Sequence, residues 1–246
     1  AESLSDVVIR DLEIRTTDIH CGIKSKTCGE QIGQILPKTD ELLAEHKPDR
    51  VLLLGDTNSA LTAIVAARRQ IPVFHMEAGN RCYDDRVPEE INRRIIDHSS
   101  TILMPYTERS KENLVREGID RDRIFVTGNP IKEVLDTFAD QIDASYVMTA
   151  LSGKPFEYFL VTLHRAENVD SPERIKKIFD GLEAVAKKFA KNVLVPVQPR
   201  TAEKLEQHGI RPASASIRLL KALNLFDFVK LEKNSLAVLT DSGTVQ

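Results

Sequence analysis

Four polar segments, each directly after an apolar run, hold the side chains of this sequence that are best suited to acid–base chemistry. Two of the segments contribute the carboxylates Asp56 and Glu77, and a third contributes the imidazole of His164. Carboxylates and imidazoles are the groups that most often move protons in enzyme sites. The segments are Gly55-Asp56-Thr57-Asn58-Ser59, Glu77-Ala78-Gly79-Asn80-Arg81, His164-Arg165-Ala166-Glu167-Asn168 and Thr240-Asp241-Ser242-Gly243-Thr244.

Each of these residues also has a purely structural interpretation. Asp56 fits the N-cap of a helix that begins near Thr57, which is a frequent role of aspartate. Glu77 lies close to a glycine that relaxes the turn, and a single histidine such as His164 is more often a hydrogen-bonded structural residue than a catalyst. In doubly wound sheets, however, ligands bind beyond the carboxyl ends of the strands. The joint placement of these residues after strands therefore favours a functional site.

The segment from Pro88 to His98 predicts a helix. Proline in the first turn, followed by acidic residues, is typical of a helix N-terminus, where the helix dipole favours negative charge. The apolar residues of this helix, Ile91, Ile95 and Ile96, are expected to face inward.

The charged residues of the same helix allow two interpretations. Glu89 with Arg93 and Glu90 with Arg94 have the i,i+4 spacing of helix-surface ion pairs, worth about 0.2–0.5 kcal/mol each. Alternatively, Arg93 faces a cleft and binds a phosphate group, with Glu89 at the mouth as an acid or base. The residues alone leave both interpretations open.

The turn Ser242-Gly243-Thr244 is a candidate phosphate-binding segment. It follows a predicted strand and precedes an expected helix, so its backbone N–H groups and hydroxyls are available to an anion. Phe228 could stack on a base, although packing in the core is the more ordinary role of a phenylalanine.

The elements that position these residues alternate along the chain between strand and helix. Residues 51–54, 57–69 and 71–76 form a βαβ pattern, which predicts two parallel strands with a right-handed crossover. The further predicted strands are 102–104, 124–127, 158–163, 193–197, one near 217 and 236–239; the further predicted helices are 108–117, 172–189, 201–208 and about 228–233, with a helical connector over 132–150.

Two successive βα series predict an α/β fold with two Rossmann-like, doubly wound domains. We place the boundary near Gly128–Ile131, which gives an N-terminal domain of residues 1–130 and a C-terminal domain of residues 131–246. The first series lacks an opening strand and glycine turn, and the chain stops where a helix is expected. The pattern is that of a fold truncated at both ends.

Composition excludes several classes of protein. The chain has 246 residues, of which 41% are hydrophobic and 29% charged, the balance of a globular protein. With a net charge of -3, no general attraction to nucleic acid or to an anionic membrane is expected. No apolar run approaches the ~20 residues of a membrane span. Three cysteines without a CxxC pair indicate neither a disulfide framework nor a zinc site, and favour the reducing cytoplasm.

An ordered set of motifs resembles the non-hydrolysing UDP-N-acetylglucosamine 2-epimerases. The resemblance runs from about Val51 to the last residue, in the order of the family. The motifs are Gly-Asp-Thr-Asn-Ser at 55–59, His-Met-Glu-Ala-Gly-Asn-Arg at 75–81, Val-Pro-Glu-Glu-Ile-Asn-Arg at 87–93, Thr-Gly-Asn-Pro at 127–130, Leu-Val-Thr-Leu-His-Arg-Ala-Glu-Asn at 160–168 and Thr-Asp-Ser-Gly-Thr-Val-Gln at 240–246.

The resemblance implies a fold like that of the GT-B glycosyltransferases, with the nucleotide sugar bound between the domains. It implies interconversion of UDP-N-acetylglucosamine and UDP-N-acetylmannosamine through a glycal intermediate, for cell-surface polysaccharide precursors, without a redox cofactor or a metal. It also implies a homodimer.

The resemblance further implies a role for each matching residue. Asp56 and Glu77 correspond to acid–base carboxylates, with Glu89 and His164 as further catalytic residues. Arg93 corresponds to a substrate contact, and the remaining nucleotide contacts are Ser242, Gly243 and Thr244 on the diphosphate and Phe228 on the uracil ring.

Four other functions remain alternatives. The first is a 2-epimerase of a modified UDP-sugar, such as a UDP-2,3-diacetamido sugar or its uronic acid. The second is a hydrolysing epimerase that releases UDP. The third is a GT-B glycosyltransferase that needs an acceptor, and the fourth is a protein that binds nucleotide sugars without catalysis.

Overall fold

A computed structural model of the chain describes residues 4–242, which divide into two compact units. The N-terminal unit is Thr17–Glu133. The C-terminal unit comprises the described parts of Val134–Gln246 and of Ala1–Thr16. The chain passes from one unit to the other between Glu133 and Val134. The strand–helix pattern does not indicate that the described part of Ala1–Thr16 belongs with the C-terminal unit.

The N-terminal unit is built on a three-stranded parallel sheet in the order β1-β2-β3. Its strands are β1 (Val51–Leu54), β2 (Val73–Met76) and β3 (Ile102–Met104), and its helices are α2 (Cys28–His46), η1 (Asn58–Leu61), α3 (Thr62–Arg68), α4 (Pro88–Ser99), α5 (Glu108–Arg116) and η2 (Arg121–Arg123). The predicted βαβ unit is confirmed, since Leu54 lies opposite Met76 in a parallel ladder. The carboxyl ends of β1 and β2 therefore lie side by side.

One predicted strand of this unit is wrong. Residues 124–127 form a single parallel bridge, from Ile124 to Leu103, rather than a strand. The Phe125 N–H still donates to Leu103 O at 2.9 Å and the Thr127 N–H to Pro105 O at 3.0 Å, so the segment runs beside β3, but Phe125 and Val126 are exposed.

The C-terminal unit is built on a four-stranded parallel sheet in the order β6-β5-β4-β7. Its strands are β4 (Tyr158–Thr162), β5 (Asn192–Pro196), β6 (Ile217–Leu220) and β7 (Ala237–Thr240). Its helices are α1 (Leu4–Asp11), α7 (Ala139–Ala144), α8 (Val147–Ala150), α9 (Ala166–Val169), α10 (Pro172–Phe189), α11 (Pro199–Gln207) and α12 (Leu225–Lys233); α6 (Ile131–Thr137) spans the change of unit.

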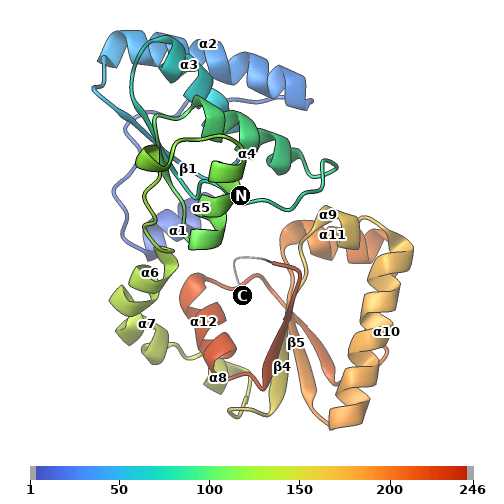
Figure 1. Cartoon of the computed structure of the whole chain (residues 1–246). Helices are drawn as coiled ribbons and strands as arrows, with labels where there is room; N and C mark the ends of the chain where they lie inside the picture. Colours follow the sequence, from blue (N-terminus) through green and yellow to red (C-terminus); the bar gives the residue numbers. More distant parts are fainter. Residues whose placement is uncertain (1–3, 243–246) are drawn as a thin grey trace. The chain divides into compact units, whose positions relative to one another are not determined.

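Alternate residues of β4 pack on opposite faces of this sheet, as the period of a strand requires. Phe159 and Val161 belong to the core beneath α10, whereas Tyr158 and Leu160 belong to a second core with Leu231 of α12. Figure 1 shows α10 on one side of β4 and β5, with α12 and α8 on the other. The doubly wound arrangement that the sequence predicts is confirmed in this unit.

Among residues 4–242, none of the helices combines the length and the apolar character that are needed to cross a bilayer.

Candidate active site

Two carboxylates lie at the carboxyl edge of the N-terminal sheet. Asp56 follows β1 and Glu77 follows β2, whose last residues are register partners. Gly55, directly before Asp56, lies beside Glu77, and a Cβ added to it would be 3.3 Å from Oε2 of Glu77. Gly55 also has a φ of +78°, a conformation that glycine adopts without strain. This position therefore leaves room for the Glu77 carboxylate.

Glu77 has a strained backbone and a perturbed carboxyl group. Its φ is +68°, in the left-handed region that residues other than glycine rarely occupy. Burial raises the pKa of Glu77, and the negative charge of Asp56 raises it further, against the opposing effects of Arg93, His75 and the hydrogen bond from Asn80. A carboxyl group whose pKa is raised by burial and by a neighbouring carboxylate is suited to acid–base chemistry.

Arg93 of α4 joins Asp56 to the helix. Its Nε donates to Oδ2 of Asp56 at 2.7 Å, and its NH1 donates to Oε2 of Glu90 at 3.0 Å. The N-cap interpretation of Asp56 is not what the structure shows, because η1 begins after Thr57 and the Asp56 carboxylate accepts from Arg93 instead. Arg93 is thus held beside Asp56 at the sheet edge.

Glu90 is the residue that fixes this arrangement, and its side chain is fully buried. It accepts backbone N–H bonds from Cys82 at 3.0 Å and Tyr83 at 3.1 Å, and it pairs with Arg93 and Arg94. Burial alone would raise the pKa of Glu90, but the hydrogen bonds from Cys82, Tyr83 and Arg93 lower it to about 2. An ionised Glu90 therefore ties the loop after β2 to α4.

A buried charge network lies beneath the carboxylates. His75 Nδ1 is 2.8 Å from Oδ1 of Asp97, and its Nε2 is 2.9 Å from the Gly55 carbonyl oxygen. Both partners are acceptors, so either ring nitrogen has an acceptor within hydrogen-bond distance when it carries a proton. Oδ2 of Asp97 receives Arg81 at 2.8 Å and the Gly79 N–H at 3.2 Å. The network holds the ends of β1 and β2 against α4.

The helix α4 differs from its prediction in the face that it buries. Ile96 is buried, but Ile91 and Ile95 are 49% and 38% exposed, while Glu90, Asn92 and Asp97 face inward. The reason is that the sheet edge beneath this helix presents polar groups, so a polar face packs better there than an apolar one. The predicted inward placement of Ile91 and Ile95 is wrong.

Glu89 is exposed, and within the described part of the chain no hydrogen bond or ion pair joins it to Asp56, Glu77 or Arg93. Arg93 thus bonds Asp56 directly and both influence the pKa of Glu77, whereas Glu89 has no direct bond to any of the three among the described residues.

The carboxyl edge of the C-terminal sheet carries a pocket of about 370 Å³. Three residues from the sequence prediction line it, namely His164, Phe228 and Ser242. Phe228 also packs against the core around Leu231, so its structural and functional interpretations are compatible. Gly243 and Thr244 lie outside the described residues.

Asp241 holds His164, one of the residues that line this pocket, in place. Its carboxylate is 3.0 Å from Nδ1 of His164 and accepts the backbone N–H groups of His164 and Arg165 at 3.1–3.2 Å. Asn168 donates to the same carboxylate at 3.1 Å. The His164 ring is thereby oriented with its Nε2 free of this carboxylate.

Sequence reasoning missed the positioning residues. Glu90 directly follows the candidate Glu89, Asp241 directly precedes the candidate Ser242, and Asp97 has no candidate beside it. Each of the three is defined by several bonds to backbone N–H groups or cations. The one available signal was an acidic residue at a position where the surrounding elements predict burial.

Comparison with known proteins identifies the family. The family model described as UDP-N-acetylglucosamine 2-epimerase matches residues 1–246. A protein of Methanocaldococcus jannaschii named UDP-N-acetylglucosamine 2-epimerase is 36% identical, over 100% of this chain and 69% of the relative. A Pseudomonas aeruginosa protein named UDP-2,3-diacetamido-2,3-dideoxy-D-glucuronate 2-epimerase is 33% identical, over 99% and 68%.

A solved structure supports the same assignment. The Methanocaldococcus jannaschii UDP-GlcNAc 2-epimerase in complex with UDP-GlcNAc and UDP superposes with a TM-score of 0.88 and 37% identity, covering 97% of this chain and 67% of that one. The chain thus spans about two thirds of the length of these relatives. It belongs to the UDP-N-acetylglucosamine 2-epimerase family.

Proposed function

We propose that the protein interconverts UDP-N-acetylglucosamine and UDP-N-acetylmannosamine without net hydrolysis, for the synthesis of cell-surface polysaccharide precursors. The observation that carries the proposal is the pair of carboxylates, Asp56 and Glu77, of which Glu77 has a raised pKa. Membership of the family and the UDP-GlcNAc complex of the Methanocaldococcus relative support the substrate.

The reaction needs an acid–base pair because the C2 proton of the sugar is not adjacent to a carbonyl group. A base removes this proton, its electron pair forms the C1–C2 double bond of a glycal, and the C1–O bond breaks to release UDP. A diphosphate oxygen of UDP then attacks C1 while an acid returns a proton to the opposite face of C2. Asp56 and Glu77, whose pKa is raised, are the carboxyl groups that we assign to these two steps.

The remaining residues are assigned to binding and to further proton transfer. Arg93 contacts the substrate, and its anchoring by Asp56 and Glu90 fixes its guanidinium. Phe228 stacks on the uracil ring, and Ser242, Gly243 and Thr244 hold the diphosphate. His164 and Glu89 complete the catalytic set, with His164 oriented by Asp241.

Product analysis tests the proposal. The full-length protein is incubated with UDP-N-acetylglucosamine alone, and the products are separated by reverse-phase chromatography. A new UDP-sugar without accumulating UDP is the expected result. Accumulating UDP with free N-acetylmannosamine would replace the proposal with a hydrolysing epimerase, and turnover only after an acceptor is added would replace it with a glycosyltransferase.

A second candidate substrate is a modified UDP-sugar. The Pseudomonas relative, whose name specifies a diacetamido glucuronate, supports this alternative. A comparison of kcat/KM for UDP-N-acetylglucosamine and UDP-2,3-diacetamido-2,3-dideoxyglucuronate distinguishes the two, and a higher value for the latter would reassign the substrate.

The same proposal includes a cytoplasmic homodimer. The three cysteines, Cys21, Cys28 and Cys82, are free and exposed, which suits a reducing compartment. Light scattering of the full-length protein checks the dimer, and fractionation of cells checks the compartment.

A further inference from the structure

A second pocket opens at the amino edge of the C-terminal sheet, away from the pocket of His164 and Phe228. Its volume is about 270 Å³, and it is lined at the first residues of the strands by Tyr158, Asn192 and the segment around Ser216. The pocket of His164 lies at the other end of the same strands. A strand of five residues such as β4 separates the two ends by about 15 Å. We name this site the amino-edge pocket.

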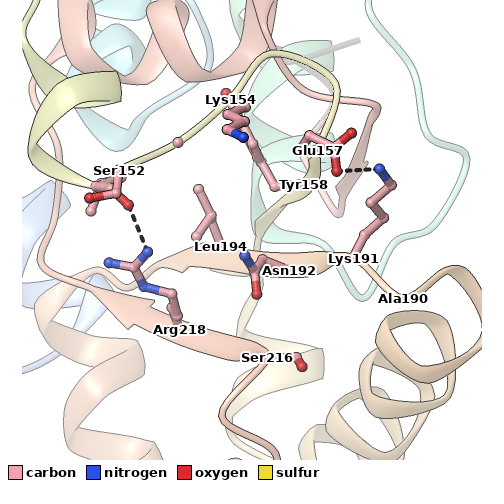
Figure 2. Close-up of a pocket in the computed structure, with 12 residues that line it drawn as sticks. Ser152, Lys154, Glu157, Tyr158, Ala190, Lys191, Asn192, Leu194, Ser216 and Arg218 are labelled. Atoms are coloured by element: carbon pink, nitrogen blue, oxygen red, sulfur yellow. Dashed lines mark hydrogen bonds and ion pairs between the residues drawn. The ribbon is translucent and has the colours of Figure 1, made fainter.

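The amino-edge pocket has an excess of positive charge. Three cations, Lys154, Lys191 and Arg218, line it against a single carboxylate, Glu157, which is a net charge of +2. Lys191 already pairs with Glu157. Figure 2 shows that pair on one side of the pocket and Arg218 on the other, with Asn192 and Leu194 between them.

Arg218 is the residue that points most clearly to a ligand. It is half-buried, and its NH1 donates at 2.9 Å to the carbonyl oxygen of Leu151, a neutral acceptor. Within residues 4–242 no carboxylate forms an ion pair with it. A guanidinium has five N–H donors, so this one bond leaves most of them for an anion. A half-buried charge without an acidic partner is also costly, which an anion would offset.

Backbone hydrogen bonds hold the segment that carries Lys154 in place. The Gly153 N–H donates to Met148 O at 2.8 Å, the Phe156 N–H donates to Asn234 O at 2.8 Å, and the Glu157 N–H donates to Lys154 O at 3.2 Å. The backbone that carries Lys154 is therefore preorganised, which reduces the entropic cost of binding.

We propose that the amino-edge pocket binds the phosphate group of a small phosphate monoester. Such a group carries a charge near −2 at pH 7, which matches the net charge of the lining. Arg218 binds it through its planar fork and Lys154 as a point charge. The hydroxyls of Ser152 and Ser216 and the amide of Asn192 supply further polar groups around it.

Calorimetry of the full-length protein tests this site. Saturating UDP first occupies the nucleotide pocket, and glycerol 3-phosphate or inorganic phosphate is then titrated at constant ionic strength. The expected result is one further binding event per chain, which weakens as the pH falls through about 6 because the phosphate loses a charge. Binding of inorganic phosphate but not of glycerol 3-phosphate would assign the site to the free ion. The absence of a binding event with both probes would overturn the proposal.

Three variants test whether the phosphate probe binds in the amino-edge pocket. Lys154→Met and Arg218→Met should each weaken the binding of glycerol 3-phosphate by about tenfold or more, since each removes a charge-assisted contact. Lys177→Met is the matched control, because Lys177 is exposed and lies far from the pocket. The pocket-lining residue Ala190 directly follows the last residue of α10, Phe189, and Lys177 lies twelve residues before Phe189, about 18 Å along the helix. Lys154 is exposed, so its variant remains informative even if Arg218→Met fails to fold. Unchanged affinity in Lys154→Met and in a folded Arg218→Met would overturn the proposal.

Discussion

At the scale of single residues, the carboxyl pair is what distinguishes this sheet edge from an ordinary loop. Asp56 and Glu77 are close enough for the charge of one to raise the pKa of the other. Asp56→Asn and Glu77→Gln should each lower kcat for epimerisation by about 10²–10⁴-fold, which is the range for loss of a general acid or base. Neither variant should change the affinity for UDP, which calorimetry measures. Turnover at the wild-type rate in both variants would contradict their role.

The raised pKa of Glu77 also has a consequence for stability. The Glu77 carboxyl group holds its proton more tightly in the folded state than in the unfolded state. Ionisation of Glu77 therefore lowers the free energy of unfolding as the pH rises through the folded pKa of this group. Glu77→Gln should therefore have a higher Tm than the wild type at pH 7, and the difference should disappear below the ordinary carboxyl pKa of about 4.5. Thermal melts at a series of pH values check this, with the exposed Glu89→Gln as the control. A lower Tm for Glu77→Gln at pH 7 would contradict it.

Arg93 is expected to act through binding rather than through proton transfer. Arg93→Ala removes a guanidinium that two carboxylates hold in place, so KM for the UDP-sugar should rise by about tenfold or more. Steady-state kinetics measure this change. An unchanged apparent affinity would argue against a position of Arg93 in the substrate site.

At the scale of elements, helix α4 is held to the sheet by polar contacts. Glu90 is the centre of these contacts, and breaking a buried ion pair of this kind costs about 3–5 kcal/mol. Glu90→Gln should therefore unfold at a lower denaturant concentration at pH 7. Since the folded pKa of Glu90 is about 2, its contribution is full above the ordinary carboxyl pKa and is lost as the pH falls from there towards 2.

Denaturant titrations at several pH values check this prediction for Glu90. Glu89→Gln is the neighbouring control, because Glu89 is exposed on the same helix turn. A loss of stability in Glu90→Gln that stays constant as the pH falls to 2 would show that the ionised carboxylate is not its source.

Strand and helix periodicity predicts most of the fold, and it fails where polar groups are buried. The βα alternation gives both parallel sheets, because the strands are short apolar runs and the helices have a clear 3.6-residue pattern. It misplaces Ile91 and Ile95, since an apolar helix face is expected to turn inward and here the inward face carries Glu90, Asn92 and Asp97. The acid–base candidates follow from their positions after strands. Glu90 emerges only from its contacts with the loop after β2, and Asp241 only from contacts with residues that are far away in the sequence.

At the scale of the whole molecule, each unit has its own sheet and its own core, and each sheet presents a polar carboxyl edge. The proposal assigns proton transfer to residues of the N-terminal unit and nucleotide binding to residues of the C-terminal unit. UDP at about 100 times its Kd should therefore stabilise wild type and Asp56→Asn equally, by about 2.7 kcal/mol.

Phe228→Ala should lose most of that stabilisation, because stacking on a base is worth about 1–3 kcal/mol. Since Phe228 also packs in the core, the comparison is made between the melts of each variant with and without UDP. Full stabilisation of Phe228→Ala by UDP would contradict the proposed contact of Phe228 with the uracil ring.

Solvent hydrogen exchange at C2 tests the central claim most directly. Proton NMR of the full-length protein with UDP-N-acetylglucosamine in D2O, without NAD or an acceptor, follows the anomeric and C2 signals. We expect the manno epimer to appear with deuterium at C2 and no free UDP to accumulate. We expect Glu77→Gln to form neither the manno epimer nor free UDP. Formation of the manno epimer with its C2 proton retained from the substrate would contradict proton transfer through these carboxylates.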